Sequence, residues 1–455
     1  MKHKREEFGT KKLTRLLFEQ AMPASIGILV LSIYGIVDTI FVGRWVGHLG
    51  IAAITVVLPI TFFISSIGMS IGVGGASIIS RAFGKDNDEK AYRTFGNQVL
   101  LTLILSVLFV VLGFTFMEPI LKVFGGRGEA LVPAEAYFKI ILIGVPFLAW
   151  SMMSNNVIRA EGYPKIAMLI MVIPAVFNII LDPIFIVWLD MGIEGAAYAT
   201  TISYMASAVF ALWFFTKGKS QMQINSTYLI PDFPILKEIG SLGSVTLARQ
   251  GTISILAIVL NNSLFNYGGE LGLSTYGIIN RVLMFANFPV LGITQGFVPI
   301  VGFNFGAGKL DRVKSIIKIA MTSASGLAFI IFAAILLFAP SIISVFTNDN
   351  ALIDATSPAI RKVFLATPLL AISLLGSAYF QAVGKAFPAL ILSLSKQGFL
   401  LIPLVLILPI FFGLDGIWYA FPMADVGAAS LTLIYLRVKG PKFQSDQTIQ
   451  LQQQD

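Results

Sequence analysis

Twelve long apolar runs determine what this chain can fold into. Each is near the ~20 residues that an α-helix needs to cross ~30 Å of hydrocarbon. Of the 455 residues, 56% are hydrophobic and only 12% are charged, so too few polar groups remain to cover a water-soluble fold. The runs therefore predict an all-α integral membrane protein with twelve transmembrane helices. They occupy residues 16–42, 50–80, 95–117, 133–156, 164–188, 192–215, 239–263, 272–302, 315–339, 358–381, 387–411 and 416–437.

The basic residues predict how these spans are oriented. Lys and Arg gather in both tails, in the central linker and in the loops after spans two, four and eight, whereas the opposite loops are acidic or carry few charges. By the positive-inside rule, the basic segments are cytoplasmic. We therefore expect a multi-pass protein of the cell (inner) membrane with both termini cytoplasmic. The net charge of +8 then reflects membrane topology, and nucleic acid is not an expected partner.

The chain repeats itself with a period of 222 residues. Phe83-Gly84 aligns with Phe305-Gly306, and after one deletion the period becomes 221 residues. Each half holds six spans, an even number, so both halves enter the membrane from the same side. The repeat predicts two parallel six-helix lobes with pseudo-two-fold symmetry along the membrane normal. The predicted segments are a cytoplasmic tail (1–15), an N-terminal lobe (16–215), a cytoplasmic linker (216–238), a C-terminal lobe (239–437) and a disordered cytoplasmic tail (438–455).

Polar residues of the first half break this repeat. Asp38, Asn178 and Asp182 all align with leucines of the second half, so the shared scaffold does not require them. Asp38 and Asp182 reach similar depths in the membrane, Asn178 lies one turn before Asp182 on the same helix face, and Thr200 descends to a comparable level. A carboxylate at this depth costs roughly 3 kcal/mol unless it meets a cavity or a partner. An aspartate that merely caps a helix end is the alternative interpretation.

Burial favours the protonated form of a carboxyl group. Asp38 and Asp182 are therefore candidates to take up a proton on one side of the membrane and release it on the other. Pro23 lies about four turns before Asp38 and can bend the first span, although membrane helices also tolerate proline without a hinge role.

The second half carries charges of its own within the predicted spans. Arg249 lies in span seven, Arg281 in span eight, Lys396 in span eleven and Asp425 in span twelve. Asp425 could neutralise Arg281 or Lys396 as a structural ion pair. Alternatively, the basic side chains could line a cavity and set its potential, and the sequence leaves both interpretations open.

Several further side chains are candidates to line a substrate cavity. Aromatic faces attract cations, and methionine adapts to varied ligands, although most such side chains in membrane proteins only face lipid or core. The candidates are Tyr34, Met69, Arg249, Gln250, Met284 and Phe285.

No enzyme signature is found in the sequence. The chain has no GxxxxGK[ST] loop to bind ATP phosphates. It has no cysteine and two histidines, which are too few for a zinc site by themselves. We therefore expect a protein that is not an enzyme and needs no cofactor.

Several segments together resemble the multidrug and toxic compound extrusion (MATE) family. They are VDTIFVG in span one, RAFGKDNDEKAYR after span two, IRAEGYPK after span four, NIILDPIFIV in span five and GIEGAAYAT in span six. The resemblance extends over residues 12–440. It implies two six-helix lobes arranged in a V around a central cavity, and export of drugs, often organic cations, in exchange for H⁺ or Na⁺.

The resemblance also implies roles for individual residues. The residues that match the family's ion site in the N-terminal lobe are Asp38, Asn178, Asp182 and Thr200, which would bind H⁺ or Na⁺. Pro23 matches the proline at which the first helix bends when that site changes state. Some relatives use acidic residues in spans seven and ten, and this chain has none there.

We therefore expect a monomeric secondary active exporter in the bilayer. It would antiport small-molecule drugs, chiefly lipophilic or organic cations, against H⁺ or Na⁺ by rocker-type alternating access. A lipid-linked oligosaccharide flippase of related architecture is the main alternative, because an anionic substrate would suit Arg249, Arg281 and Lys396. A major-facilitator carrier and a non-transporting scaffold or receptor fit the motifs and the membrane carboxylates less well.

Overall fold

The computed structural model describes residues 2–440, which form helices and short connections without any strand. The predicted all-α membrane fold is thus confirmed. In chain order the helices are α1 (Lys2–Thr10), α2 (Leu13–Phe41), η1 (Val42–Val46), α3 (His48–Gly84), α4 (Asp88–Thr115), α5 (Met117–Val123), η2 (Gly128–Ala130), α6 (Leu131–Ala160), α7 (Pro164–Asp182), η3 (Pro183–Trp188), α8 (Gly192–Lys217), η4 (Ser226–Tyr228), α9 (Phe233–Gly306), α10 (Leu310–Ile343), α11 (Asn350–Phe364), α12 (Thr367–Ala382), α13 (Ala386–Leu394), η5 (Ser395–Leu401), α14 (Ile402–Phe412) and α15 (Leu414–Lys439).

The helices account for the twelve predicted spans. Within the described residues, ten helical stretches are long and apolar enough to cross a membrane. One of them, α9, has 74 residues and would be about 111 Å long if straight, so it must hold two spans. It breaks at Gly269, whose φ of +57° is non-helical. Helices α11 and α12 pass the same test together as one span bent by 46°, which completes the twelve.

The chain divides into two compact units. The first unit contains Met1–Thr10 and Ile26–Leu247, and the second contains Lys11–Ser25 and Ala248–Asp455. The beginning of α2 thus belongs to the second unit, and the beginning of α9 belongs to the first. We call these two parts the exchanged parts of α2 and α9, because each belongs to the unit opposite to the rest of its helix. They end at Ser25 and Leu247, which are one repeat period apart.

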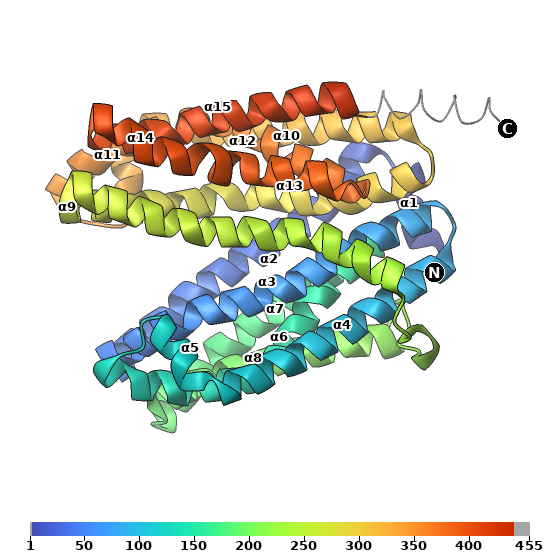
Figure 1. The fold of residues 1–455 in the computed structure, drawn as a ribbon, viewed down its shortest axis with the longest axis horizontal. Coiled ribbons are helices and arrows are strands. Elements are labelled where there is room, and N and C mark those ends of the chain that lie inside the picture. The colour runs from blue at the N-terminus through green and yellow to red at the C-terminus, as the bar shows by residue number, and fades with distance from the viewer. Residues whose placement is uncertain (1, 441–455) are drawn as a thin grey trace. The chain divides into compact units, whose positions relative to one another are not determined.

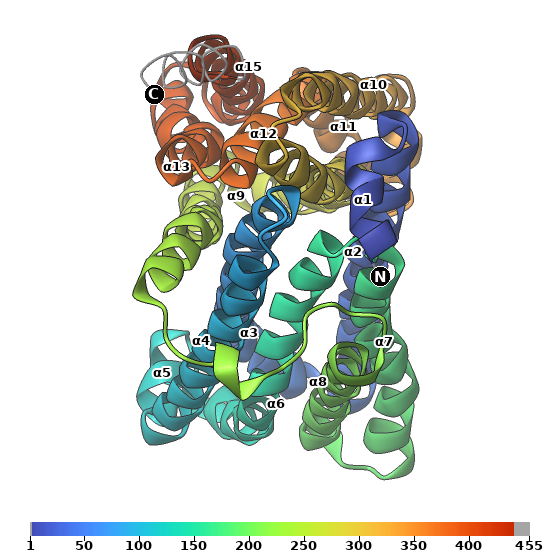
Figure 2. The same ribbon diagram turned by 90° about the vertical axis from the view of Figure 1, so that its right-hand side faces the viewer.

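In the first unit, α3 packs against α6 and α4, and α8 packs against α6 and α7 (Figure 1). Its core is built from fully buried apolar side chains on these helices, such as Val57, Phe138, Leu142 and Ala197. In the second unit, α12 packs against α10 and α15 (Figure 2). Helix α14 packs against α15 (Figure 1). Each unit therefore has a separate apolar core.

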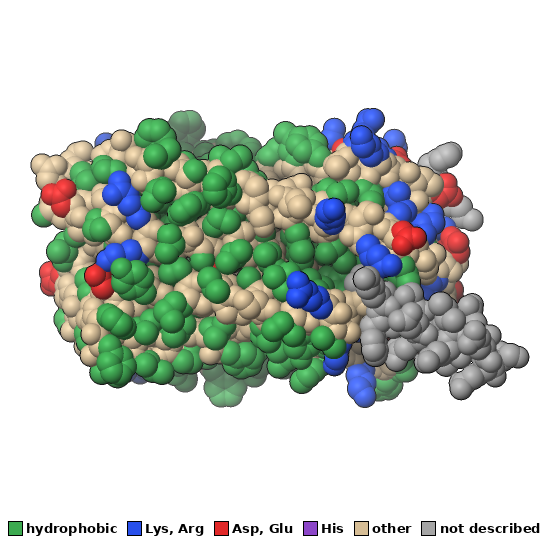
Figure 3. All heavy atoms as spheres, turned by 90° about the horizontal axis from the view of Figure 1, so that it is seen from above, with side chains coloured by type: hydrophobic (Ala, Val, Ile, Leu, Met, Phe, Trp, Pro, Cys, Tyr) green, Lys and Arg blue, Asp and Glu red, His purple; other side chains and the backbone are tan. Residues whose placement is uncertain are grey.

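The outer surface matches a membrane environment. Figure 3 shows a face on which hydrophobic side chains spread over the middle, whereas most Lys and Arg side chains gather toward one end. Large apolar side chains are exposed along the spanning helices, including Leu108 on α4, Ile330 on α10 and Phe411 on α14. Such surfaces suit hydrocarbon rather than water.

Paired glycines show that the two units share one backbone design. Gly162 and Gly384, one period apart, have φ of +89° and +84°. Gly192 and Gly413, which align after the deletion, have φ of +55° and +56°. Only glycine adopts this conformation without a steric penalty, so the repeated glycines reflect turns that both units need.

The exchanged part of α2 packs closely on α9 within the second unit. A Cβ atom on Gly292 would lie 2.8 Å from the backbone nitrogen of Ser25, and one on Gly296 would lie 2.8 Å from that of Ala21. Gly292 and Gly296 are four residues apart, as are Ala21 and Ser25. Small residues at this spacing let two membrane helices approach to backbone contact.

The exchanged part of α9 packs in the same way on α3 within the first unit. A Cβ atom on Gly243 would lie 2.5 Å from Ser70 Oγ, and one on Gly74 would meet the carbonyl oxygen of Ile239. Gly74 and Gly296 are one period apart, as are Ala21 and Gly243. The same small-residue contact thus occurs once in each unit.

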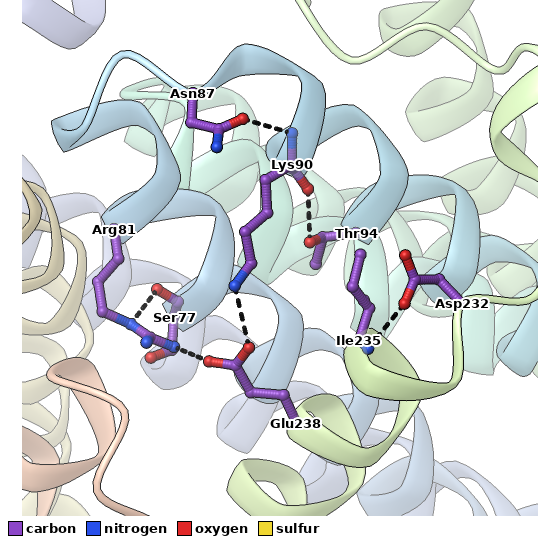
Figure 4. Close-up of polar contacts among 8 residues, drawn as sticks. All are labelled: Ser77, Arg81, Asn87, Lys90, Thr94, Asp232, Ile235 and Glu238. Carbon is purple, nitrogen blue, oxygen red and sulfur yellow. Dashed lines mark hydrogen bonds and ion pairs between the residues drawn. The ribbon is translucent and has the colours of Figure 1, made fainter.

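Polar contacts also attach the start of α9 to the first unit (Figure 4). Glu238 accepts hydrogen bonds from Arg81 Nη2 at 2.8 Å and Lys90 Nζ at 3.3 Å. Arg81 Nε in turn donates to the carbonyl oxygen of Ser77 at 3.2 Å. Asp232 Oδ1, just before α9, accepts from the backbone N–H of Ile235 at 3.2 Å.

The N-terminal segment is not merely a polar tail, because Lys2–Thr10 form helix α1. Arg5 is only 3% exposed and donates hydrogen bonds to both carboxylate oxygens of Asp88. Its guanidinium also lies 5.0 Å from the centre of the Phe83 ring, and Phe8 is fully buried. Such a paired, stacked arginine attaches α1 firmly to the first unit. Of the C-terminal tail, residues 441–455 lie outside the described part.

Candidate ion and substrate site

Two membrane carboxyl groups meet within the first unit. Asp38 lies on the part of α2 that belongs to this unit, and Asp182 is the last residue of α7. Asp38 is 8% exposed and Asp182 is fully buried. Their carboxyl groups are within hydrogen-bonding reach of each other. Two carboxylates this close repel each other, so the pair favours a bound proton or cation.

A proline sets the local backbone at Asp182. Pro183 follows directly and opens the π-helical segment η3. Proline lacks the N–H that would continue the α-helical bonding pattern, and single turns of π-helix are frequent at functional sites. The segment NIILDPIF thus ends α7 at the residue whose side chain joins the pair.

The polar groups around the pair leave several acceptors without donors. Asn178 Nδ2 donates to Thr200 Oγ1 at 3.2 Å. Among the described residues, however, no hydrogen bond reaches Asn178 Oδ1, Asp38 Oδ1 or either Asp182 oxygen, and all four atoms are buried. Buried acceptors without partners are costly. Buried oxygen atoms without donors are suited to a proton or a hard cation such as Na⁺.

Three tyrosines complete this cluster. Tyr34 and Tyr204 are within hydrogen-bonding reach of each other, and Tyr137 is within reach of Thr200. Tyr34 lies one turn before Asp38 on α2 and was among the cavity candidates. Sequence reasoning missed Tyr137 and Tyr204. Tyr204 could have been found, because it lies one turn after Thr200 on the same face of α8.

The other predicted residues lie outside this cluster. Met69 is half-buried on α3 in the first unit. Arg249 and Gln250 are half-buried on the part of α9 that belongs to the second unit. The remaining two cavity candidates, Met284 and Phe285, follow on the same helix. The role of all these side chains in substrate binding stays a prediction.

Two further predicted features have clear positions. Pro23 lies inside α2, two residues before the point where this helix passes from the second unit to the first. Of the two partners considered for Asp425, the structure selects Lys396, whose Nζ lies 2.5 Å from Asp425 Oδ1. Arg281 is exposed on α9.

A third buried carboxyl group lies in the first unit but outside the spans. Glu161 follows the end of α6 and is only 3% exposed. It accepts hydrogen bonds from Ser220 Oγ at 2.8 Å and from the backbone N–H groups of Gln221 and Met222 at 2.7 and 3.1 Å. Glu161 therefore attaches the segment after α8 to the end of α6.

Burial raises the pKa of Glu161 from 4.5 to about 7, although its hydrogen bonds favour the ionised form. The folded protein holds this proton more tightly than the unfolded chain, so the free energy of unfolding should fall as the pH rises from 4.5 to 7. We expect Glu161→Gln to remove up to about 3 kcal/mol of this fall. Thermal unfolding of the purified protein between pH 5 and 8 measures it.

The exposed Glu129→Gln substitution is the control and should leave the pH dependence of unfolding unchanged. Parallel stability curves for Glu161→Gln and the unsubstituted protein would contradict the prediction.

The sequence model of the MatE family matches residues 23–184 and 247–407. The multidrug export protein MepA of Staphylococcus aureus (strain NCTC 8325 / PS 47) is 29% identical over 432 residues, which cover 94% of this chain and 95% of that protein. MepA of Staphylococcus saprophyticus is 29% identical over 418 residues, with 91% and 92% covered.

Solved structures are similar over nearly the whole chain. A crystal structure of MATE in complex with MaL6 has a TM-score of 0.91 at 26% identity and covers 96% of this chain and 99% of that one. A MOP superfamily transporter from Pyrococcus furiosus, described as having a binding pocket of reverse polarity that suggests a different function, has a TM-score of 0.89 at 26% identity. It covers 96% of this chain and 98% of that one.

Proposed function

Because this chain belongs to the MatE family, we propose that it is a secondary active multidrug exporter. It exchanges small lipophilic or organic cations for H⁺ or Na⁺. The observation that supports this most directly is the buried pair of Asp38 and Asp182, which has oxygen atoms free to hold an ion. The MepA relatives are named multidrug export proteins, which supports the export of drugs.

In this proposal, the coupling ion binds within the first unit. A proton would be shared between Asp38 and Asp182, because a hydrogen bond between two carboxyl groups requires that one of them be protonated. Na⁺ would instead take oxygens of Asp38, Asn178, Asp182 and Thr200. Tyr34 and Tyr137 would orient the neighbouring polar groups.

Transport then requires that ion and drug favour opposite states of one equilibrium. Ionised Asp38 and Asp182 attract a cationic drug, and a bound proton or Na⁺ removes that attraction. Rocker-type alternating access follows if the ion-bound and drug-bound forms prefer to open on opposite sides of the membrane. Pro23 would act as the hinge at which α2 adjusts to the state of this site.

We further propose a monomer in the cell membrane with both termini cytoplasmic. The gathering of Lys and Arg toward one end of the face in Figure 3 supports this orientation, because such residues are retained on the cytoplasmic side.

The experiment that tests the proposal is efflux of a fluorescent lipophilic cation from cells that lack their own drug pumps. The proton gradient and the Na⁺ gradient are collapsed separately. We expect efflux to need one of the two gradients, which identifies the coupling ion. Efflux that persists without either gradient would contradict secondary active transport.

A lipid-linked oligosaccharide flippase is the second candidate. The Lys396 side chain, 21% exposed, favours an anionic substrate. Competition separates the two candidates, because lipophilic cations should inhibit an exporter of cations and should leave a flippase unaffected.

A further inference from the structure

An ion pair lies near the middle of the membrane within the second unit. Lys396 is ten residues from the start of α13, or about 15 Å along the helix, and Asp425 is eleven residues from the start of α15. Both side chains thus lie close to the centre of their spans. Lys396 Nζ is 2.5 Å from Asp425 Oδ1, and the side chain of Asp425 is only 5% exposed.

The fold itself does not require this pair. Lys396 and Asp425 align with Pro174 and Tyr204 of the first half, which folds in the same way without charges at these positions. Replacing a buried ion pair with apolar residues is often neutral or stabilising, and a charged residue at the centre of a membrane helix costs about 2.5–3.5 kcal/mol on insertion scales. A purely structural role would be more easily filled by two apolar side chains.

The backbone at Lys396 is also unusual. Lys396 is the second residue of η5, a π-helical segment inside the span. In the equivalent span of the first unit, the π-helical segment η3 follows Asp182 directly. Each unit therefore has a π-helical segment beside an ionisable residue in the same span, and such segments are frequent at functional sites.

The ammonium group of Lys396 can donate more hydrogen bonds than Asp425 accepts from it. It carries three N–H donors, and within residues 2–440 only Asp425 is in contact with it as a polar partner. The Lys396 side chain is 21% exposed, against 5% for Asp425, so the cation is the accessible member of the pair. An ionisable group exposed at this depth usually faces a water-filled cavity.

A second cationic side chain, Arg249, lies on α9, a helix that η5 contacts. A Cβ atom on Gly398 in η5 would lie 3.4 Å from Thr252 of α9, so these two helices touch there. Arg249 is three residues before Thr252 and shares its face of α9. Arg249 therefore adds a positive charge on the helix that η5 contacts.

From this arrangement we propose that Lys396, held by Asp425, binds the carboxylate of an amphiphilic anion or zwitterion. The free donors of Lys396 match a carboxylate acceptor. The transport of such a ligand rests on the proposed function, whereas its binding can be measured independently.

The test uses a rhodamine zwitterion with a free carboxylate and its methyl ester, which lacks that charge. Binding of each dye to the purified full-length protein is measured by fluorescence polarisation. We expect Lys396→Met to weaken binding of the free acid about tenfold and binding of the ester less than twofold, because only the acid loses a charged hydrogen bond. Lys396→Arg should retain binding of the acid.

Two further variants keep the result interpretable. Lys362→Met removes another short ion pair, with Asp415 at 2.6 Å, and should change neither affinity. The double variant K396M/D425L replaces both charges with apolar side chains and should fold yet bind the acid as weakly as Lys396→Met.

Equal loss for both dyes, or unchanged binding of the acid to Lys396→Met, would overturn the proposal. Absence of measurable binding of the acid to the unsubstituted protein would also overturn it. The proposed export function is tested separately, and it fails if efflux of the ester needs no ion gradient. That result would leave the ratio of the affinities for the acid and the ester unchanged.

Discussion

We expect Asp38→Asn to abolish ion-driven efflux of lipophilic cations. Asparagine preserves the shape of the side chain but cannot take up a proton, and it removes the negative charge that attracts Na⁺ or a cationic drug. A charged hydrogen bond or ion contact of about 3 kcal/mol corresponds to a roughly hundredfold change in affinity, so efflux should fall to the background of cells without the protein. Efflux is measured at equal expression, with the gradient that the unsubstituted protein needs.

The control for this substitution is Asp311→Asn. It makes the same chemical change at the fully exposed side chain of Asp311 and should leave efflux unchanged. Retention of gradient-dependent efflux by Asp38→Asn would show that the Asp38–Asp182 pair does not couple transport to the ion.

The second large effect concerns the packing of α2 on α9 within the second unit. We expect Gly292→Leu to destabilise the protein by about 3 kcal/mol, because a side chain at this position collides with the backbone of Ser25 and the helices must separate. The midpoint of thermal unfolding in detergent and the yield of folded protein measure the effect.

Gly277→Leu provides the matched control on the same helix. A Cβ atom on Gly277 meets nothing within 4 Å, so this substitution should have little effect or a slight stabilising one through better helix propensity. Equal stability of the Gly292→Leu and Gly277→Leu variants would contradict the close contact between Gly292 and Ser25.

The spans could be predicted from the sequence, and their packing could not. Apolar runs of the right length have one stable arrangement in a membrane, which is why all twelve were recognisable. Helix α1 was not predicted, because a nine-residue polar segment becomes helical only through its tertiary contacts, chiefly those of Arg5. The passage of α2 from the second unit to the first at Ser25 could not be predicted either, because small residues occur along most of these helices.

The candidate site could be predicted in part. The depths of Asp38 and Asp182 indicated that the two could meet, because helix rise converts sequence distance into position along the membrane normal. Depth alone says nothing about rotation around a helix. That is why Tyr137 was missed, and why Lys396 and Arg281 both remained candidates to pair with Asp425 until the structure placed them.

The contact between Ser25 and Gly292 also has a consequence for biosynthesis. Gly292 follows Ser25 by 267 residues, so at about 5–20 residues per second the ribosome delivers it roughly 13–53 s after Ser25. During that interval the beginning of α2 lies in the membrane without the glycine surface that it will contact. The first helix to be inserted is therefore among the last to be packed. Until the second half is inserted, its small-residue face can contact lipid, an insertase or other helices in a non-native way.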